Sequence, residues 1–237
     1  KLGRYSFIGS NPFLVLSTHG DQCILTRGAE KSLLRGNPFD ILNQLLEVYH
    51  LDSCSSPVPF TGGAVGYFSY DLCHFVERLP STAADDLKLP ECYFGFYDRV
   101  LAFDNLQETV YIISTGFPEL KETKRMKRAS RRLHEMKDKL ADVSIFGQEA
   151  PSMPVSFPVK RATLKGGFTH QEYVDVVEKA RQYIIAGDIF EVNISQRFET
   201  NLSLTPYELY RRLRQINPAP FASYLGFDDV SVISASP

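Results

Sequence analysis

Short apolar runs separated by turn residues fill the first part of the chain. Between Tyr5 and Thr26 three such runs follow one another, divided by Ser-Asn-Pro and by His-Gly-Asp. Strand-length runs at this spacing are typical of an antiparallel meander. The pattern therefore predicts that the chain begins with three consecutive antiparallel strands.

A helix is expected next. From Pro38 onward, apolar residues recur with the 3.6-residue helical period and form one face, made of Ile41, Leu42, Leu45, Leu46 and Tyr49. Residues 60–71 then combine three glycines with strand-forming residues, and glycine within a strand marks a bulge or a close backbone approach. Because this segment has neither G-x-G-x-x-G spacing nor a Walker lysine, it predicts a strand rather than a phosphate loop.

Two further apolar runs and a polar helix complete the first region. Residues 93–103 and 109–114 are typical of strands, with Asp104-Asn105 as the turn between them. A long helix is expected from Pro118 to about residue 143, with nine lysines and arginines between 121 and 139 against three acids. Since the acids interleave with the basic residues, we expect a solvated helix surface there.

The sequence pattern changes after a proline-rich stretch. Residues 144–167 contain three prolines and few large apolar groups, which favours a linker. Thr169 can cap a helix that ends at Gly187. A strand at 189–198, a second helix from Thr205-Pro206 through Arg214, and a hairpin formed by 221–225 and 230–234 are expected after it. These patterns predict a first domain at 1–143, a linker at 144–167, and a second domain beginning at 168–237.

The predicted strand at 189–198 has an ambiguous polar row. It would place Asn193, Ser195 and Arg197 on one face, and polar groups on a central strand are costly to bury without partners. An exposed face of an edge strand explains the row equally well. The residues alone therefore leave its role open.

Composition narrows the classes of function. The net charge is −2 and no strong basic excess is present, so we expect no nucleic-acid partner. No apolar run approaches the roughly 20 residues that a bilayer span needs, and the first residues lack the apolar core of a signal peptide, which favours a cytoplasmic protein without a membrane contact.

The four cysteines lack metal-site spacing and are expected to be free thiols. Scattered histidines give little support to a metal site.

Several segments together resemble a known enzyme family. The segments AGDIFEVNISQRF (186–198), NPAPFASYL (217–225) and ISASP (233–237) resemble the start of the chorismate-binding domain of anthranilate synthase component I and aminodeoxychorismate synthase component I. The segments GRYSFIGSNP (3–12) and FTGGAVGYFSYD (60–71) resemble the N-terminal domain of the same enzymes. The resemblance implies an α+β fold of the anthranilate-synthase type, a largely antiparallel β-sandwich with helices packed outside, truncated here at the C-terminus.

Within this family the sequence is closer to aminodeoxychorismate synthases. Anthranilate synthases tend to read VVLSQRF and NPSPYM, whereas this chain has VNISQRF (192–198) and NPAPF (217–221). The resemblance implies the conversion of chorismate and ammonia to 4-amino-4-deoxychorismate in the folate pathway. A glutamine amidotransferase subunit would supply the ammonia, and Mg²⁺ would bind the substrate carboxylate. Anthranilate synthase component I, which yields anthranilate and pyruvate for tryptophan, is the close alternative.

The family's catalytic and metal-binding residues are expected beyond Pro237, so none is assigned within this chain. The resemblance carries over one site only in part, a pocket of the tryptophan-binding type between the two domains. Its members here would be Arg4, Ser6, Asn217, Pro218, Ala219, Pro220 and Phe221. A purely structural role for these residues in joining two domains is an equal alternative.

A different class of function also remains open, a non-catalytic module that binds an amino acid. The sequence beyond Pro237 would discriminate among these hypotheses. Continuation as S-P-E-R followed by P-I-K-G-T favours aminodeoxychorismate synthase, P-I-A-G-T favours anthranilate synthase, and an immediate stop favours the module.

Overall fold

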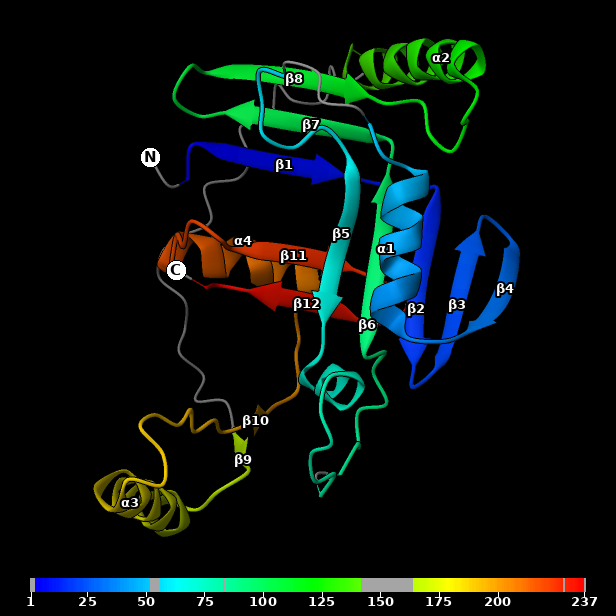
Figure 1. Cartoon of the computed structure of the whole chain (residues 1–237). Coiled ribbons are helices and arrows are strands. Elements are labelled where there is room, and N and C mark those ends of the chain that lie inside the picture. Colours follow the sequence, from blue (N-terminus) through cyan, green and yellow to red (C-terminus); the bar gives the residue numbers. More distant parts are fainter. Residues whose placement is uncertain (1–2, 52–55, 83, 142–163, 228, 237) are drawn as a thin grey trace. The chain divides into compact units, whose positions relative to one another are not determined.

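The computed structural model describes residues 3–51, 56–82, 84–141, 164–227 and 229–236. The chain divides into two compact units (Figure 1). The first unit comprises Lys1–Glu149 with Ala219–Pro237, and the second comprises Ala150–Pro218. The first unit contains β1 (Tyr5–Gly9), β2 (Leu14–His19), β3 (Gln22–Arg27), β4 (Glu30–Arg35), α1 (Pro38–Val48), β5 (Gly63–Phe68), the 3-10 helix η1 (Tyr70–Phe75), β6 (Cys92–Tyr97), β7 (Arg99–Asp104), β8 (Thr109–Ser114), α2 (Glu122–Ala141), β11 (Ser223–Gly226) and β12 (Ser231–Ser234). The second contains β9 (Lys165–Gly166), α3 (His170–Ala186), β10 (Phe198–Glu199) and α4 (Pro206–Ile216).

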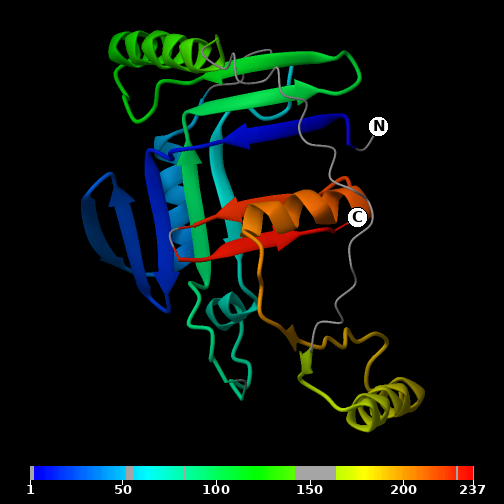
Figure 2. The same ribbon diagram turned by 180° about the vertical axis from the view of Figure 1, so that it is seen from behind.

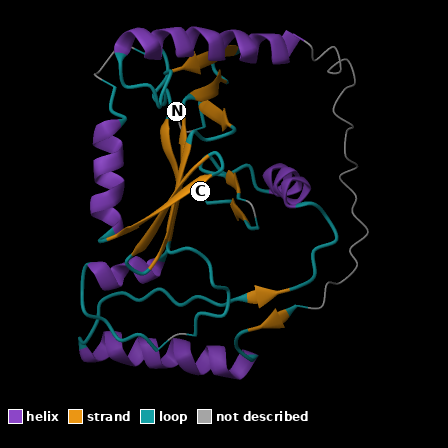
Figure 3. Ribbon diagram, turned by 90° about the vertical axis from the view of Figure 1, so that its right-hand side faces the viewer, coloured by secondary structure: helices purple, strands orange, loops and turns teal. Residues whose placement is uncertain are grey.

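The main core lies between a five-stranded antiparallel sheet and helix α1. The strands are ordered β4-β3-β2-β6-β5, and alternate residues of β2, such as Leu14 and Leu16, are fully buried as the period of two requires. The apolar face of α1 predicted from the sequence packs on this sheet through Ile41, Leu42 and Leu45. Figure 3 shows α1 along one face of the strands. The helix predicted from Pro38 is thus confirmed.

The predicted opening meander is wrong in its pairing. β2 and β3 do pair with each other, but β1 pairs with β7 in a separate three-stranded sheet of order β1-β7-β8. The run at 93–103 is likewise two strands, β6 and β7, which belong to different sheets. The chain passes from one sheet to the other at Asp98, which lies between β6 and β7. The pattern of apolar residues alone does not indicate this break. The local pattern therefore indicated most strands of the first unit, although not β4 (Glu30–Arg35), whereas the pairing of β1 with β7 depends on residues about 100 positions apart.

Asp98 also fixes helix α2. Its carboxylate is 1% exposed and accepts hydrogen bonds from Arg132 at 2.9 and 3.0 Å and from Arg128 at 3.5 Å. A buried charge is tolerated when it is paired in this way. The helix predicted after Pro118 is confirmed, and part of its basic face proves to be an internal anchor rather than a solvated surface.

The hairpin β11–β12 packs on the face of the five-stranded sheet that lies opposite α1. Phe227 lies against Tyr93 and Tyr67, with ring centroids 3.9 and 5.7 Å apart respectively. Figure 2 shows this hairpin on the side of the sheet away from α1. The predicted hairpin is confirmed. At Gly66 of β5 an added Cβ would overlap the carbonyl oxygen of Tyr93, so the glycine in this strand permits close backbone approach, as predicted.

The second unit contains the predicted helices but not the predicted strand. Thr169 caps α3 in a complete capping box with Glu172, and Gly187 ends it at φ 80°. Thr205 caps α4 in the predicted position. The strand predicted at 189–198 is wrong: among the described residues this segment pairs only where Phe198 and Glu199 meet β9. A strand needs a neighbouring strand for its hydrogen bonds, and the polar row of Asn193 and Ser195 is exposed.

Most of the predicted linker, residues 144–163, lies outside the described residues, and the predicted domain limits remain a prediction. None of the helices in the described ranges combines the length and the apolarity that a membrane-spanning segment needs.

Candidate functional site

The predicted pocket residue Arg4 is held by a carboxylate. Its Nε lies 3.0 and 3.1 Å from the two oxygens of Asp104, and its Nη2 lies 2.6 Å from Oδ2. Asp104 is 1% exposed and ends β7, directly beside the first residues of β1. Two-point pairing of this kind fixes the guanidinium plane as well as its position. The pair therefore orients Arg4, and a ligand carboxylate could use only the N–H groups that Asp104 leaves, which are those of Nη1 and the second N–H of Nη2.

The ion pair stabilises the ionised form of Asp104. Its hydrogen bonds with Arg4, aided by backbone N–H groups of Gln107 and Leu106, hold the pKa of Asp104 at about 2 against an opposing effect of burial. The same two N–H groups lie 3.1 and 3.0 Å from Oδ1 and close the turn after β7. Asp104 is thus a charged structural centre joining β1 to the β7–β8 turn.

Ser6, the second predicted residue, belongs to the same network. Asn105 donates through Nδ2 to Ser6 Oγ and to the Gly3 carbonyl, both at 3.3 Å, and its backbone N–H donates to the Arg4 carbonyl at 2.8 Å. Sequence reasoning assigned Asp104 and Asn105 only a turn. Their additional role could have been suspected because Asp and Asn side chains bind nearby backbone groups in turns.

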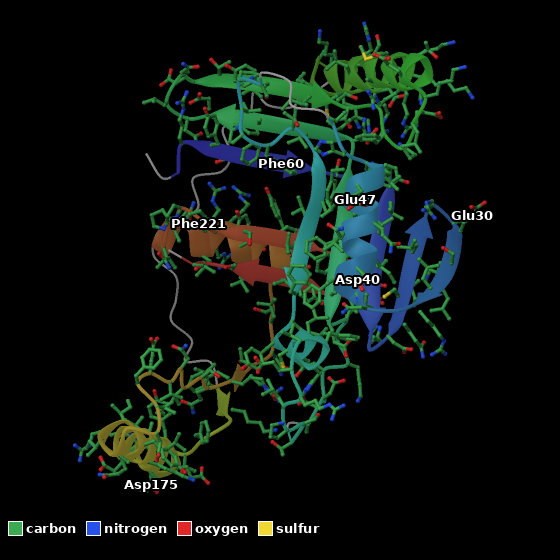
Figure 4. The ribbon with its side chains drawn as sticks, in the orientation of Figure 1. Glu30, Asp40, Glu47, Phe60, Asp175 and Phe221 are labelled. Carbon is green, nitrogen blue, oxygen red and sulfur yellow. The ribbon has the colours of Figure 1, made fainter. Side chains whose placement is uncertain are left out.

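The first unit also brings the predicted turn residues Ala219, Pro220 and Phe221 to this region. A side chain on Gly3 would meet Pro220 Cβ at 3.9 Å, so the chain just before Arg4 lies against the turn. The turn is closed by the Ala222 N–H, which donates to the Ala219 carbonyl at 3.1 Å. Phe221 is 60% exposed where the chain leads into β11 (Figure 4). It is available as an apolar contact.

Asn217 and Pro218 belong to the second unit. Asn217 follows the last residue of α4, and its N–H donates to the Leu213 carbonyl at 2.8 Å. The five predicted turn residues thus span the division between the units. The structure gathers Arg4, Ser6 and 219–221 in one unit, and the joint role of all seven residues remains a prediction.

An aromatic row that sequence reasoning missed lies beside Arg4 on β1. The guanidinium carbon of Arg4 is 4.8 Å from the centre of the Tyr5 ring, and Tyr5 stacks with Phe7 at 6.3 Å. Phe60 meets Phe7 edge-on at 5.6 Å (Figure 4). Alternation along β1 puts Tyr5 and Phe7 on one face. A charged donor beside aromatic faces suits a ligand that is both aromatic and charged.

The described residues include no group of three or more His, Cys, Asp and Glu side chains that could hold a metal ion. Cys23, Cys73 and Cys92 are free thiols, while Cys54 lies outside the described residues. Burial raises the pKa of Cys92 to about 12, an effect that neighbouring Cys23 reinforces. A thiol with so high a pKa is a poor nucleophile at neutral pH.

The fold is similar to that of a known enzyme. The crystal structure of anthranilate synthase component I from Streptococcus pneumoniae superposes with a TM-score of 0.76 and 26% sequence identity, covering 99% of this chain and 50% of that one. The predicted α+β fold with antiparallel sheets and external helices is thereby confirmed. The neighbour extends well beyond the part matched here.

Sequence comparison gives relatives with two names. Anthranilate synthase component 1 of Acetivibrio thermocellus is 35% identical, matching 100% of this chain and 48% of its own length. Aminodeoxychorismate synthase component 1 of Bacillus subtilis is 28% identical, matching 99% of this chain and 48% of its own length. The chain thus spans about half the length of these curated relatives. The family model described as chorismate binding enzyme matches residues 3–237, so the chain belongs to the chorismate-binding enzyme family.

Proposed function

We propose that this chain is part of an enzyme that adds ammonia to chorismate and yields 4-amino-4-deoxychorismate. The match of residues 3–237 to the chorismate-binding family carries the proposal. The choice of product rests on VNISQRF (192–198) and NPAPF (217–221), which resemble aminodeoxychorismate synthases. A relative of that name aligns over 99% of the chain.

Anthranilate formation is the second candidate because of a specific observation. The Acetivibrio thermocellus relative, named anthranilate synthase component 1, is more similar at 35% identity than the Bacillus subtilis relative at 28%. Overall identity reflects the whole fold, whereas the motifs concern few positions. The two candidates share the substrate and differ in whether pyruvate is eliminated.

We propose that the metal-binding and acid–base residues lie in one half of the enzyme and that this chain, as scaffold, belongs to the other half. Mg²⁺ would polarise the substrate carboxylate and stabilise charge in the transition state. The resemblance to the family implies that the metal-binding and acid–base residues lie beyond Pro237, and we assign them to sequence outside this chain. A glutamine amidotransferase subunit is the proposed source of ammonia. We further propose a cytoplasmic location.

The residues around β1 and 217–221 are proposed to form an amino-acid pocket, with tryptophan as its ligand. Phe221 and the aromatic row on β1 would supply apolar contacts, and the rigid prolines would orient backbone carbonyls toward an ammonium group. Because Arg4 is paired with Asp104, its contribution would be mainly to position β1. The ligand ammonium then matters more to recognition than its carboxylate.

The decisive experiment assays the protein as its gene encodes it. Purified protein is mixed with chorismate, Mg²⁺ and ammonium chloride, and products are separated by liquid chromatography and identified by mass. We expect 4-amino-4-deoxychorismate without pyruvate release. Anthranilate with stoichiometric pyruvate would establish the second candidate, and unchanged chorismate would favour a binding module. The isolated 237-residue chain is expected to give no product.

A further inference from the structure

Arg99 is a buried cation with unused hydrogen-bond donors. Its side chain is 3% exposed at the start of β7, and neither Nε nor Nη1 has a hydrogen-bond partner among the described residues. The nearest carboxylate oxygen, Oε2 of Glu135 on α2, lies 3.7 Å from Nη1, too far for a hydrogen bond. Leaving a buried charged donor unsatisfied costs more than leaving a neutral one. A group that accepts from Arg99 would remove this cost.

Ser114 supplies a second unused donor at the same place. It lies directly opposite Arg99 in the β7–β8 ladder, and its Oγ is also buried without a partner among the described residues. Side chains directly opposite in an antiparallel pair lie on the same face, with Cβ atoms about 5 Å apart. The unpaired groups of Arg99 and Ser114 are therefore neighbours. Because Arg99 Nη1 lies 3.7 Å from Glu135 on α2, both side chains lie on the face of the sheet against which α2 packs.

The surrounding charges favour an anion over a neutral partner. Besides Arg99, the cluster contains Arg128, Arg131 and Arg132 of α2, whereas its carboxylates are Asp98 and Glu135. Asp98 is already shared by Arg128 and Arg132, and Glu135 accepts from Arg131 at 2.6 Å. Arg99, Arg128 and Arg132 are 3%, 25% and 15% exposed, and Asp98 is the buried carboxylate among them, whereas Arg131 is 60% exposed. Positive charge is thus in excess in the less exposed part of the cluster, where charges interact more strongly than in water.

The ionisation of Arg99 is consistent with this excess. Burial lowers its pKa, and repulsion from Arg132 lowers it further. A bound water could also accept hydrogen bonds from Arg99 and Ser114, but it would leave the charge excess unchanged. A monovalent anion would accept from both side chains and offset the charge as well.

We propose that a small monovalent anion of the chloride class binds between β7, β8 and α2, accepting a hydrogen bond from an unused N–H group of Arg99 and one from Ser114 Oγ. The site is a structural anion site that joins helix α2 to the three-stranded sheet. It is separate from the β1 region that contains Arg4.

Bromide locates such a site directly. Crystals of the protein as encoded, grown or soaked in sodium bromide, are measured at the bromine absorption edge. An anomalous peak within hydrogen-bonding distance of both Arg99 and Ser114 is expected. An ordered water without anomalous signal, or no density between these side chains, would overturn the proposal.

A solution test distinguishes specific binding from general salt effects. Sodium chloride and sodium gluconate are compared at equal ionic strength, because gluconate is too large for a buried site. Chloride should raise the unfolding midpoint of the wild type by about 2–4 °C more than gluconate when it is several-fold above its dissociation constant. Arg99→Met and Ser114→Ala should each reduce this difference. Arg125→Met is the matched control, because Arg125 lies on α2 over the Phe117 ring, apart from the cluster. A chloride effect that persists in both site variants would contradict the proposal.

Discussion

The two units differ in what holds their helices in place. In the first unit, α1 buries Ile41, Leu42 and Leu45 in a shared core, and every apolar side chain that the described structure buries lies between Leu14 and Phe117. In the second unit, neither α3 nor α4 buries a side chain among the described residues. Both of these helices nevertheless have a threonine side chain that caps the N-terminus, and the box at α3 is complete. Capping therefore determines where a helix begins, and burial determines how firmly it is held.

The apolar stripe of α3 illustrates the difference. Val177 and Ile184 are 42% and 44% exposed, although their spacing is that of a core-facing stripe. Hydrophobic stabilisation is roughly proportional to the apolar area removed from water. The second unit therefore gains much less from its apolar residues than the first, and substitutions should have correspondingly unequal effects.

The largest expected effect is loss of a core aromatic ring. Phe96 is fully buried against Phe13 and Tyr49, so Phe96→Ala should lower the free energy of unfolding by about 3–5 kcal/mol. The matched variant in the second unit is Phe190→Ala, whose ring is 92% exposed, and its effect should stay within about 0.5 kcal/mol. Urea unfolding followed by circular dichroism measures both. Equal losses would show that the second unit has a core of its own.

Removal of the α2 anchor should rank next. Asp98→Ala leaves Arg128 and Arg132 without their carboxylate, and we expect a loss of about 3 kcal/mol, toward the lower end for buried pairs because both arginines retain some exposure. Glu178→Ala on α3 breaks an exposed pair with Arg181, which solvent screens, and should lower the free energy of unfolding much less than Asp98→Ala does. The same urea measurement applies. A small effect at Asp98 would mean that α2 is held by its apolar contacts instead.

The sequence correctly predicted those features of the two units that depend on residues close together in the chain. Thr169, Gly187 and Pro38 mark helix ends through interactions within a few residues, and the structure has them where expected. The pairing of β1 with β7 depends on residues about 100 positions apart, and no local pattern encodes it. At the candidate site, Arg4 and Ser6 were identified by resemblance. Their partners Asp104 and Asn105 were not, because an Asp-Asn turn gives no indication of a distant arginine.

Two carboxylates with the same low pKa should respond differently to acid. Both Asp104 and Glu178 have a pKa of about 2, each lowered first by a hydrogen bond from arginine. Asp104 has an ordinary value of 3.8, so its stabilisation is present above pH 4 and is lost as the pH falls toward 2. Asp104 joins β1 to β7, whereas Glu178 pairs only within α3.

Unfolding of the first unit should therefore become easier between pH 4 and pH 2, and Asp104→Asn should flatten this part of the profile. Glu178→Gln should leave it unchanged. Urea midpoints measured at intervals of half a pH unit would show the difference. An unaltered acid profile in Asp104→Asn would assign the acid dependence of this unit to other carboxylates.

The smallest effect concerns the cap of α3, and it tests whether that helix depends on local interactions. Thr169 Oγ1 accepts from the Glu172 N–H at 3.2 Å, and the Glu172 side chain accepts from the Thr169 N–H at 2.7 Å. Thr169→Ala should cost about 1 kcal/mol, which corresponds to roughly fivefold faster hydrogen exchange of α3 amides. Thr200→Ala, an exposed threonine outside helices and strands, is the control. Because α3 buries no side chain, the acceleration should be confined to α3. If amides of the five-stranded sheet exchanged faster as well, α3 would be coupled to the core, and the contrast between the two units would fail.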